Sequence, residues 1–141
     1  MKAVDTNVIV RLLIEDDLAQ AERARAIFGE EESETIFISK TVLLEAEWVL
    51  RGGYKVPKMK IFESLEALLG LANVTVEAPT VVRNALDWAQ DGLDFADALH
   101  LASVPRAEEG DGERRVFLTF DRDLAFKSAA IKDAVQVVLA K

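Results

Sequence analysis

The sequence predicts an α/β fold with a mostly parallel central sheet and helices on both of its faces. Short runs rich in Val, Ile, Phe and Leu recur along the chain, and segments with apolar residues at helical spacing separate them. Strands that alternate with helices pair in parallel, because each helix carries the chain back to the starting edge of the sheet. The 141 residues fit one domain, residues 1–141.

The first half of the chain predicts two strands and three helices. Asp17 is a suitable N-cap for the second helix, and Gly52 and Gly53 end the third. The expected elements are a strand at 3–4, helices at 7–14 and 18–28, a strand at 36–38 and a helix at 41–51.

The second half continues the alternation. Pro57 and Pro79 each suit the first turn of a further helix, because that turn leaves its N–H groups unpaired and proline has none. The other expected elements are a strand at 73–76, an apolar helix at 94–103, a buried strand at 116–120 and a terminal strand at 135–139. The charged stretches 29–34 and 106–115 are expected to be exposed loops.

Composition limits the classes of function. The chain has no cysteine, which excludes disulfides and thiolate metal sites and favours a reducing cytoplasm. It has no apolar run of membrane-spanning length and no signal-peptide pattern, so we expect no membrane association. The net charge of −8 argues against a broad basic surface for nucleic acid. Carboxylates gathered around a divalent cation nevertheless reverse the sign of the charge where a phosphate would bind.

Two aspartates follow predicted strands. Asp5 comes after the first strand and Asp121 after the strand at 116–120. Ligands of open parallel sheets bind at this carboxyl edge, so both residues are candidates for a site. Each aspartate also precedes a helix, whose N-terminus favours negative charge. Capping is therefore the alternative explanation for either residue alone.

Two further segments place acids on helices. Asp94 and Asp97 share a face near the start of the apolar helix. Asp94 suits an N-cap, whereas an unpaired Asp97 is costly there, so we expect a cation near it. On the helix at 41–51, Glu45 and Glu47 border the apolar stripe on opposite flanks. Periodicity leaves the choice between them open, and both could be ordinary rim glutamates.

Together these segments predict a metal site made of oxygen ligands. Carboxylates brought close repel one another unless a cation neutralises them, and Mg²⁺ or Mn²⁺ prefers carboxylates and water. Such ions clamp phosphate oxygens and activate a water for attack.

The inventory of residues excludes several other chemistries. His100 is the one histidine, so a ribonuclease with two catalytic histidines and a His-rich zinc site are both ruled out. We expect His100 to be a packing residue or a neighbour of Asp97, one helical turn away. The sequence has no G-x-S-x-G turn, Walker loop or G-x-G-x-x-G fingerprint, so it offers no sign of a serine hydrolase or a nucleotide cofactor.

Four blocks of the sequence, in order and with compatible spacing, resemble PIN-domain ribonucleases, most closely the VapC-type toxins of toxin–antitoxin pairs. The blocks are VDTNVIVRLL at 4–13, ISKTVLLEAEWVLR at 38–51, DFADALHLA at 94–102 and FLTFDRDL at 117–124. The resemblance runs through essentially the whole chain. It implies a PIN-like three-layer sandwich around a mostly parallel sheet of about five short strands.

The resemblance also implies residue roles. The catalytic and metal-binding acids of the family fall on Asp5, Glu45, Asp97 and Asp121. This selects Glu45 over Glu47, and it leaves Asp94 as an additional acid that assists a metal or caps its helix. The supporting residues that flank the quartet are Thr6, Asn7 and Thr119. Thr119 is the best placed of these, because it lies two residues before Asp121 on the same side of the strand.

The function implied by the resemblance is Mg²⁺- or Mn²⁺-dependent endonucleolytic cleavage of RNA by a homodimeric toxin. It implies a small antitoxin partner, of the VapB type, whose C-terminal segment covers the acidic pocket, often with an arginine. The charge of −8 is consistent with attraction of such a basic residue. The candidates for steering a phosphate are Arg11, Lys40, Arg51, Lys55 and Arg122, with solvated surface charge as the alternative for most of them.

Two other functions compete with this interpretation. A different Mg²⁺ phosphotransfer domain, such as an aspartyl phosphatase, needs a second aspartate two residues after Asp5, where this chain has Asn7. A non-catalytic PIN-like module that only binds a partner would be expected to have lost at least one acid of the quartet.

Overall fold

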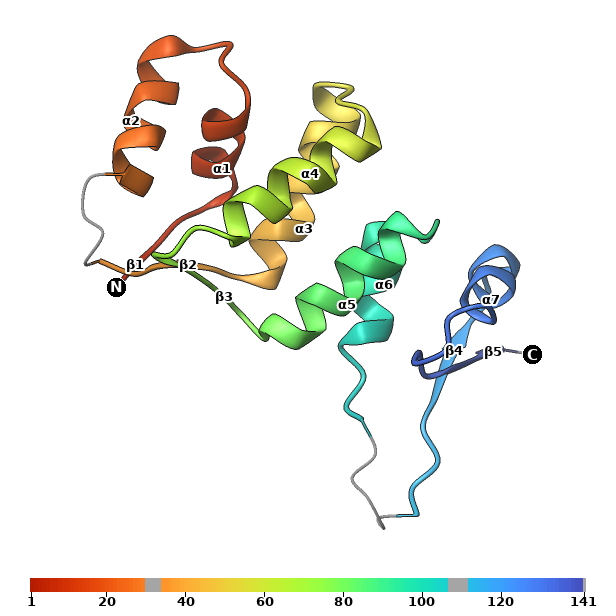
Figure 1. Ribbon diagram of the computed structural model, residues 1–141. Coiled ribbons are helices and arrows are strands. Elements are labelled where there is room, and N and C mark those ends of the chain that lie inside the picture. Colours follow the sequence, from red (N-terminus) through yellow and green to blue (C-terminus); the bar gives the residue numbers. More distant parts are fainter. Residues whose placement is uncertain (30–33, 107–111, 141) are drawn as a thin grey trace. The chain divides into compact units, whose positions relative to one another are not determined.

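The computed structural model describes residues 1–29, 34–106 and 112–140 (Figure 1). The chain divides into two compact units, Met1–Pro79 and Thr80–Lys141. Each unit contains parallel strands and helices that pack against them, which confirms the predicted α/β class. The prediction of a single domain over 1–141 stays a prediction.

The first unit contains a three-stranded parallel sheet. Its strands lie in the order β1-β2-β3, with Lys2 opposite Ile36 and Ile36 opposite Val74. The elements of this unit are β1 (Lys2–Ala3), α1 (Thr6–Leu13), α2 (Leu18–Gly29), β2 (Ile36–Ile38), α3 (Lys40–Trp48), the π-helix η1 (Val49–Gly53), α4 (Lys58–Leu69) and β3 (Val74–Val76).

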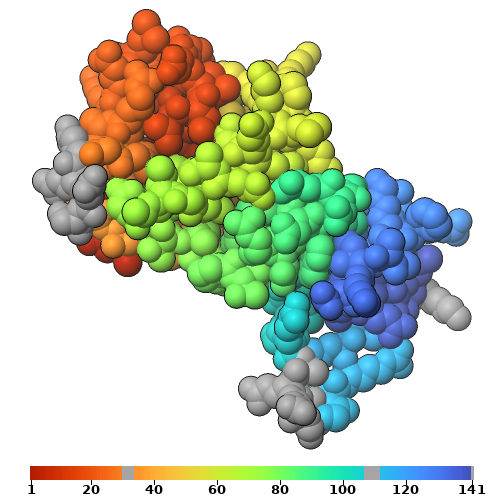
Figure 2. Space-filling view, in the orientation of Figure 1, coloured from red at the N-terminus to blue at the C-terminus, as the bar shows by residue number. Residues whose placement is uncertain are grey.

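The core of the first unit forms around β2. Ile36 and Ile38 are buried in this central strand, and α4 packs along β3. Helix α1 contacts both α2 and α3, and Figure 2 shows α1 and α2, in red and orange, in direct contact. The buried Ile9 of α1 and Leu43 of α3 supply apolar surface to this packing. The contact between α1 and α3 links the helix that follows Asp5 to the helix that carries Glu45.

The second unit contains a two-stranded parallel sheet. Strand β4 pairs with β5, so that Val116 lies opposite Gln136 and Thr119 opposite Leu139. Helix α7, between the two strands in sequence, packs against both. The elements of this unit are α5 (Pro79–Gln90), α6 (Phe95–Ala102), β4 (Val116–Thr119), α7 (Arg122–Ser128) and β5 (Gln136–Leu139).

Two predicted helix ends differ from the structure. Pro57 is the N-cap of α4 instead of a first-turn residue, whereas Pro79 begins α5 as predicted. The helix expected over 41–51 is α-helical only to Trp48, and it continues as a π-helix to Gly53. Turns of this wider type occur at the C-terminal ends of helices.

The expected burial of the strand at 116–120 is wrong at two positions. Leu118 is 63% exposed and Phe120 is 83% exposed. Strand β4 has a single partner strand among the described residues, so its sheet is too narrow to bury every side chain. Of the two predicted loops, 30–33 and 107–111 lie outside the described residues. None of the described helices is both long and apolar enough to cross a bilayer.

Candidate functional site

Asp5 connects the end of β1 to the start of α1. Its backbone is extended, and its Oδ1 accepts a hydrogen bond from the backbone N–H of Val8 at 3.2 Å. The capping role expected as the alternative is therefore present. The carboxylate remains exposed, next to the buried Thr6 and the exposed Asn7. Capping engages Oδ1 and leaves the group open to solvent, so it is compatible with a second role.

Glu45 and Glu47 have different environments on α3. Glu47 is 3% exposed, and its Oε1 accepts a 2.8 Å hydrogen bond from Nε of Arg51, one turn later. The interpretation of both residues as rim glutamates is thus wrong for Glu47, because its charge is buried and neutralised inside the chain. Glu45 is exposed, and no ion pair or hydrogen bond of its carboxylate is found within the described part of the chain.

Two acids at the start of α6, Asp94 and Asp97, are linked by a hydrogen bond. Asp94 is the N-cap of this helix, and Asp94 Oδ1 accepts from the backbone N–H of Asp97 at 3.2 Å. The cap predicted for Asp94 is confirmed. Asp97 is half-buried in the first turn. Burial raises the pKa of Asp97, and the charges of Asp94 and Asp121 raise it further.

The charges around Asp97 identify its neighbours in the second unit. The carboxylate of Asp123 also raises the pKa of Asp97, whereas His100 lowers it. His100 is exposed on α6, so its interpretation as a packing residue is wrong and its position as a neighbour of Asp97 is the one observed. Burial and these like charges together make the ionised carboxylate of Asp97 unfavourable, and a bound cation would relieve that cost.

Asp121 caps α7 at the end of β4. Its Oδ1 accepts from the backbone N–H groups of Asp123 at 2.9 Å and Leu124 at 3.1 Å. The Oγ1 of Thr119 accepts from the N–H of Asp121 at 3.0 Å, so Thr119 fixes the backbone that carries this acid. The Thr119 hydroxyl remains a donor for another group.

The sequence reasoning missed Asp123. This residue interacts electrostatically with Asp97, and Nζ of Lys127 lies 3.1 Å from its Oδ2. The available signal was the spacing Asp-x-Asp directly after a strand, which places a second carboxylate in the first turn of α7. An acid at this position also suits the positive end of the helix dipole, so the signal does not by itself indicate a ligand.

Two of the basic residues considered for phosphate contacts are held by internal partners. Arg51 pairs with Glu47, and Nη1 of Arg11 contacts both Asp16 and the hydroxyl of Tyr54. Tyr54 in turn donates to Asp16 Oδ2 at 3.2 Å, which ties the segment after α1 to the end of η1. The hydrogen bond that Asp16 accepts from the guanidinium of Arg11 lowers the pKa of Asp16. These contacts hold the first unit together.

The five acids named by the sequence are divided between the two units. Asp5 and Glu45 lie in the first; Asp94, Asp97 and Asp121 lie in the second. Inside the described ranges, no three Asp, Glu or His side chains are arranged as a metal-binding group. The donor set consists of carboxylate oxygens, which fit a hard divalent cation such as Mg²⁺ or Mn²⁺.

Comparison with protein-family models identifies the family of this chain. The family model described as the PIN domain matches residues 2–132. The matched region covers parts of both units and includes every acid and supporting residue proposed from the sequence. No curated protein matches the sequence of this chain.

Proposed function

Because the chain belongs to the PIN-domain family, we propose that it is a Mg²⁺- or Mn²⁺-dependent endoribonuclease that hydrolyses RNA phosphodiester bonds. PIN domains are generally metal-dependent nucleases that act on nucleic acid, which gives the coarse class of the enzyme. RNA as the substrate and Mg²⁺ or Mn²⁺ as the cofactor are the parts that we propose.

The observation that carries the proposal is the position of Asp97 among other carboxylates. Burial raises the pKa of Asp97, and the charges of Asp94, Asp121 and Asp123 raise it further, so the ionised carboxylate is unfavourable in the folded chain. A divalent cation relieves this cost, and when bound it neutralises phosphate oxygens and lowers the pKa of a water molecule. The residues proposed to hold the cation are Asp5, Glu45, Asp97 and Asp121.

The other residues of the proposed site act as supports. Asp94 orders the first turn of α6 through its bond to the N–H of Asp97. Thr119 holds the backbone N–H of Asp121, and Asp121 in turn caps α7. Thr6 and Asn7 follow Asp5 at the start of α1, and we propose that they orient its carboxylate. Each support limits the movement of a carboxylate, so less ordering is needed when a ligand binds.

We also propose the biological role that the sequence blocks imply. The chain is a cytoplasmic toxin of the VapC type, it forms a homodimer, and its cognate antitoxin resembles VapB. The net charge of −8 supports a partner with a basic segment. Co-expression tests this role: the chain alone should arrest growth, and a short neighbouring reading frame should restore it.

The family match argues against the phosphatase alternative, which already lacked the second aspartate at Asn7. The remaining alternative is a PIN-like module that binds without catalysis. All four acids are present in this chain, and loss of one would be expected in a degenerate module.

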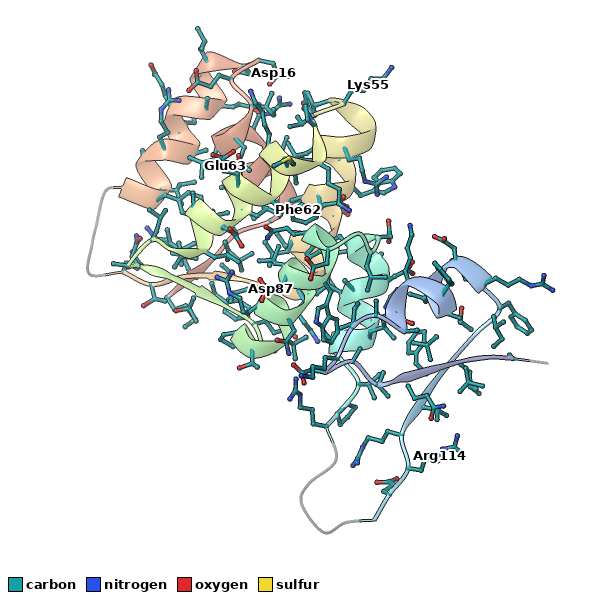
Figure 3. The ribbon with its side chains drawn as sticks, turned by 45° about the vertical axis from the view of Figure 1, so that its right-hand side comes forward. Asp16, Lys55, Phe62, Glu63, Asp87 and Arg114 are labelled. Atoms are coloured by element: carbon teal, nitrogen blue, oxygen red, sulfur yellow. The ribbon has the colours of Figure 1, made fainter. Side chains whose placement is uncertain are left out.

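The nuclease assay uses purified protein, labelled single-stranded and structured RNA, and Mn²⁺ or Mg²⁺. We expect cleavage with metal and none in EDTA. Asp97→Asn should abolish cleavage, and Asp87→Asn is the matched control, because Asp87 is an exposed aspartate of α5 (Figure 3). Equal cleavage in EDTA would remove the metal mechanism. Full activity of Asp97→Asn would remove the proposed site.

A further inference from the structure

The second unit contains a cavity that the proposed nuclease site does not use. Its volume is about 260 Å³, and its walls come from α5, from the end of α6 and from the segments before β4 and β5. Leu101 and Ala102 line it at the last turn of α6, whereas Asp97 lies in the first turn. A helix of this length spans roughly 12 Å. The cavity and the acids therefore lie at opposite ends of α6.

The same separation is seen along β4. Arg115 lines the cavity and comes directly before this strand, whereas Asp121 follows it. A strand of four residues spans about 13 Å. Both elements thus place the cavity away from the carboxyl edge where the acids lie.

Two guanidinium groups and one carboxylate, that of Asp133, lie on the wall of the cavity. Arg106 and Arg115 both line it. Nη2 of Arg115 lies 3.2 Å from Oε2 of Glu113, so this side chain is partly held in place. Guanidinium groups bind phosphate through planar, paired hydrogen bonds. Arg106 and Arg115 together therefore provide the donors that a phosphate would need at this wall.

The rest of the wall suits a ring with polar edges. Trp88 is 9% exposed and lines the cavity, beside an apolar wall that includes Val104. Asn84 offers both a donor and an acceptor, and the carboxylate of Asp133 accepts from an N–H or O–H group. A nucleotide has each matching part: a phosphate, a flat heterocycle, and amino or hydroxyl groups.

We propose that this cavity binds a single nucleotide, with its phosphate at Arg106 and Arg115 and its base against Trp88. The volume is slightly below the ~300–1,000 Å³ of typical ligand pockets, which suits a ligand the size of one nucleotide. The proposal does not depend on the nuclease function.

The nucleotide could be a free nucleoside monophosphate or the end of an RNA chain, since both present the same chemistry. A second cavity, of about 530 Å³, shares Trp88 and Asp133 with the first and adds Asp91, Lys127 and Lys132. Lys127 is paired with Asp123, which leaves Lys132 as the cation of this wall. An RNA chain that continued past its terminal nucleotide would have space there, with the ammonium of Lys132 to contact a phosphate. The two sources are therefore distinguished by experiment.

Tryptophan fluorescence measures this binding directly. The chain has two tryptophans, and Trp48 is exposed on α3, so Trp48→Phe leaves Trp88 as the sole reporter. This variant is titrated with AMP and UMP in EDTA, which removes any metal-dependent binding at the acids. We expect a saturable change in emission. Arg106→Gln should weaken binding by about 10-fold or more, because a charge-assisted phosphate contact is lost.

Arg114→Gln is the matched control. Arg114 lies on the same segment before β4 (Figure 3), it does not line the cavity, and its Nη2 contacts Gln136 at 3.4 Å. We expect it to leave nucleotide affinity unchanged, as should Asp97→Asn. A thermal melt of Arg106→Gln that matches the parent shows that the fold is intact. No saturable signal and no calorimetric heat, or equal losses in Arg106→Gln and Arg114→Gln, would overturn the proposal.

A 5′-phosphorylated trinucleotide RNA, also in EDTA, identifies the source. Binding at least 10-fold tighter than AMP, with the gain lost in Lys132→Gln, assigns the cavity to an RNA end. Equal affinity for the trinucleotide and AMP assigns it to a free nucleotide. Either result supports the cavity as a nucleotide site. Because these titrations are done in EDTA, their outcome does not depend on whether the protein cleaves RNA.

Discussion

The guanidinium of Arg51 donates a 2.8 Å hydrogen bond from Nε to Oε1 of Glu47, a carboxylate that is only 3% exposed. Glu45, two residues before Glu47 on α3, is exposed to solvent. Two glutamates that look alike in the sequence therefore have different physical situations. One charge is neutralised inside the chain, and the other is open to an external cation.

Because of this difference, replacing glutamate by glutamine should affect stability at position 47 and RNA cleavage at position 45. Glu47→Gln should lower the free energy of unfolding by about 2 kcal/mol, because it weakens a charge-assisted hydrogen bond at a buried site. Glu45→Gln should leave stability unchanged and reduce metal-dependent cleavage by roughly 100-fold, the equivalent of about 3 kcal/mol in the barrier. Urea unfolding in EDTA and RNA cleavage in Mn²⁺ measure the two effects. A stability loss confined to Glu45→Gln would contradict the assignment.

The raised pKa of Asp97 predicts a pH-dependent cost in stability. Its carboxyl is harder to ionise in the folded chain than in the unfolded chain, so the folded state keeps its proton to higher pH. Stability therefore falls as pH rises from about 3.9, the ordinary pKa of aspartate, through the raised value. Asp97→Asn should be more stable than the parent at pH 7 in EDTA, with the difference shrinking as pH falls toward that ordinary value.

Thermal melts across this pH range test the sign of the effect. Asp87→Asn is the control, and it should track the parent at every pH. A destabilised Asp97→Asn at pH 7 would show that the carboxylate is favourably placed without a cation, contrary to the environment described here.

The local sequence predicted the helix caps well, including those made by acids of the proposed site. Asp17 and Asp94 cap their helices as expected, and Asp5 and Asp121 do so as well. A cap depends on three or four neighbouring residues, so its signal is contained in a short stretch. The same stretch says nothing of whether an acid also serves a second role.

Burial was less predictable, because it depends on which elements come together. Glu47 and Arg51 show the i, i+4 spacing of an ion pair, yet the spacing does not reveal that Glu47 is inside. Leu118 and Phe120 were expected inside and are exposed, because burial of a strand depends on what covers its faces. The assignment of the quartet rests on the family resemblance, and its convergence stays a prediction.

Metal binding should stabilise the protein if the quartet holds a cation. A ligand at 100 times its dissociation constant adds about 2.7 kcal/mol to the free energy of unfolding. Mn²⁺ should therefore raise the melting temperature of the parent, and the shift should be absent in Asp5→Asn. Asp87→Asn should keep the full shift. An equal shift in Asp5→Asn would mean that Asp5 is a cap and not a ligand.

The contact between Thr119 and Asp121 predicts a positioning effect that can be separated from stability. Thr119→Val removes the oxygen that accepts from the N–H of Asp121 at 3.0 Å, whereas Thr119→Ser keeps it. We expect Thr119→Val to lower kcat for RNA cleavage by about 10-fold, with KM little changed, because a displaced carboxylate misplaces the reacting groups. Thr119→Ser should restore most of the rate.

Loss of the hydrogen bond between Thr119 and the N–H of Asp121 should also lower the free energy of unfolding of Thr119→Val by about 1 kcal/mol. Steady-state kinetics and urea unfolding of both variants provide the measurements, and equal kcat values for valine and serine would show that the hydroxyl does not position Asp121.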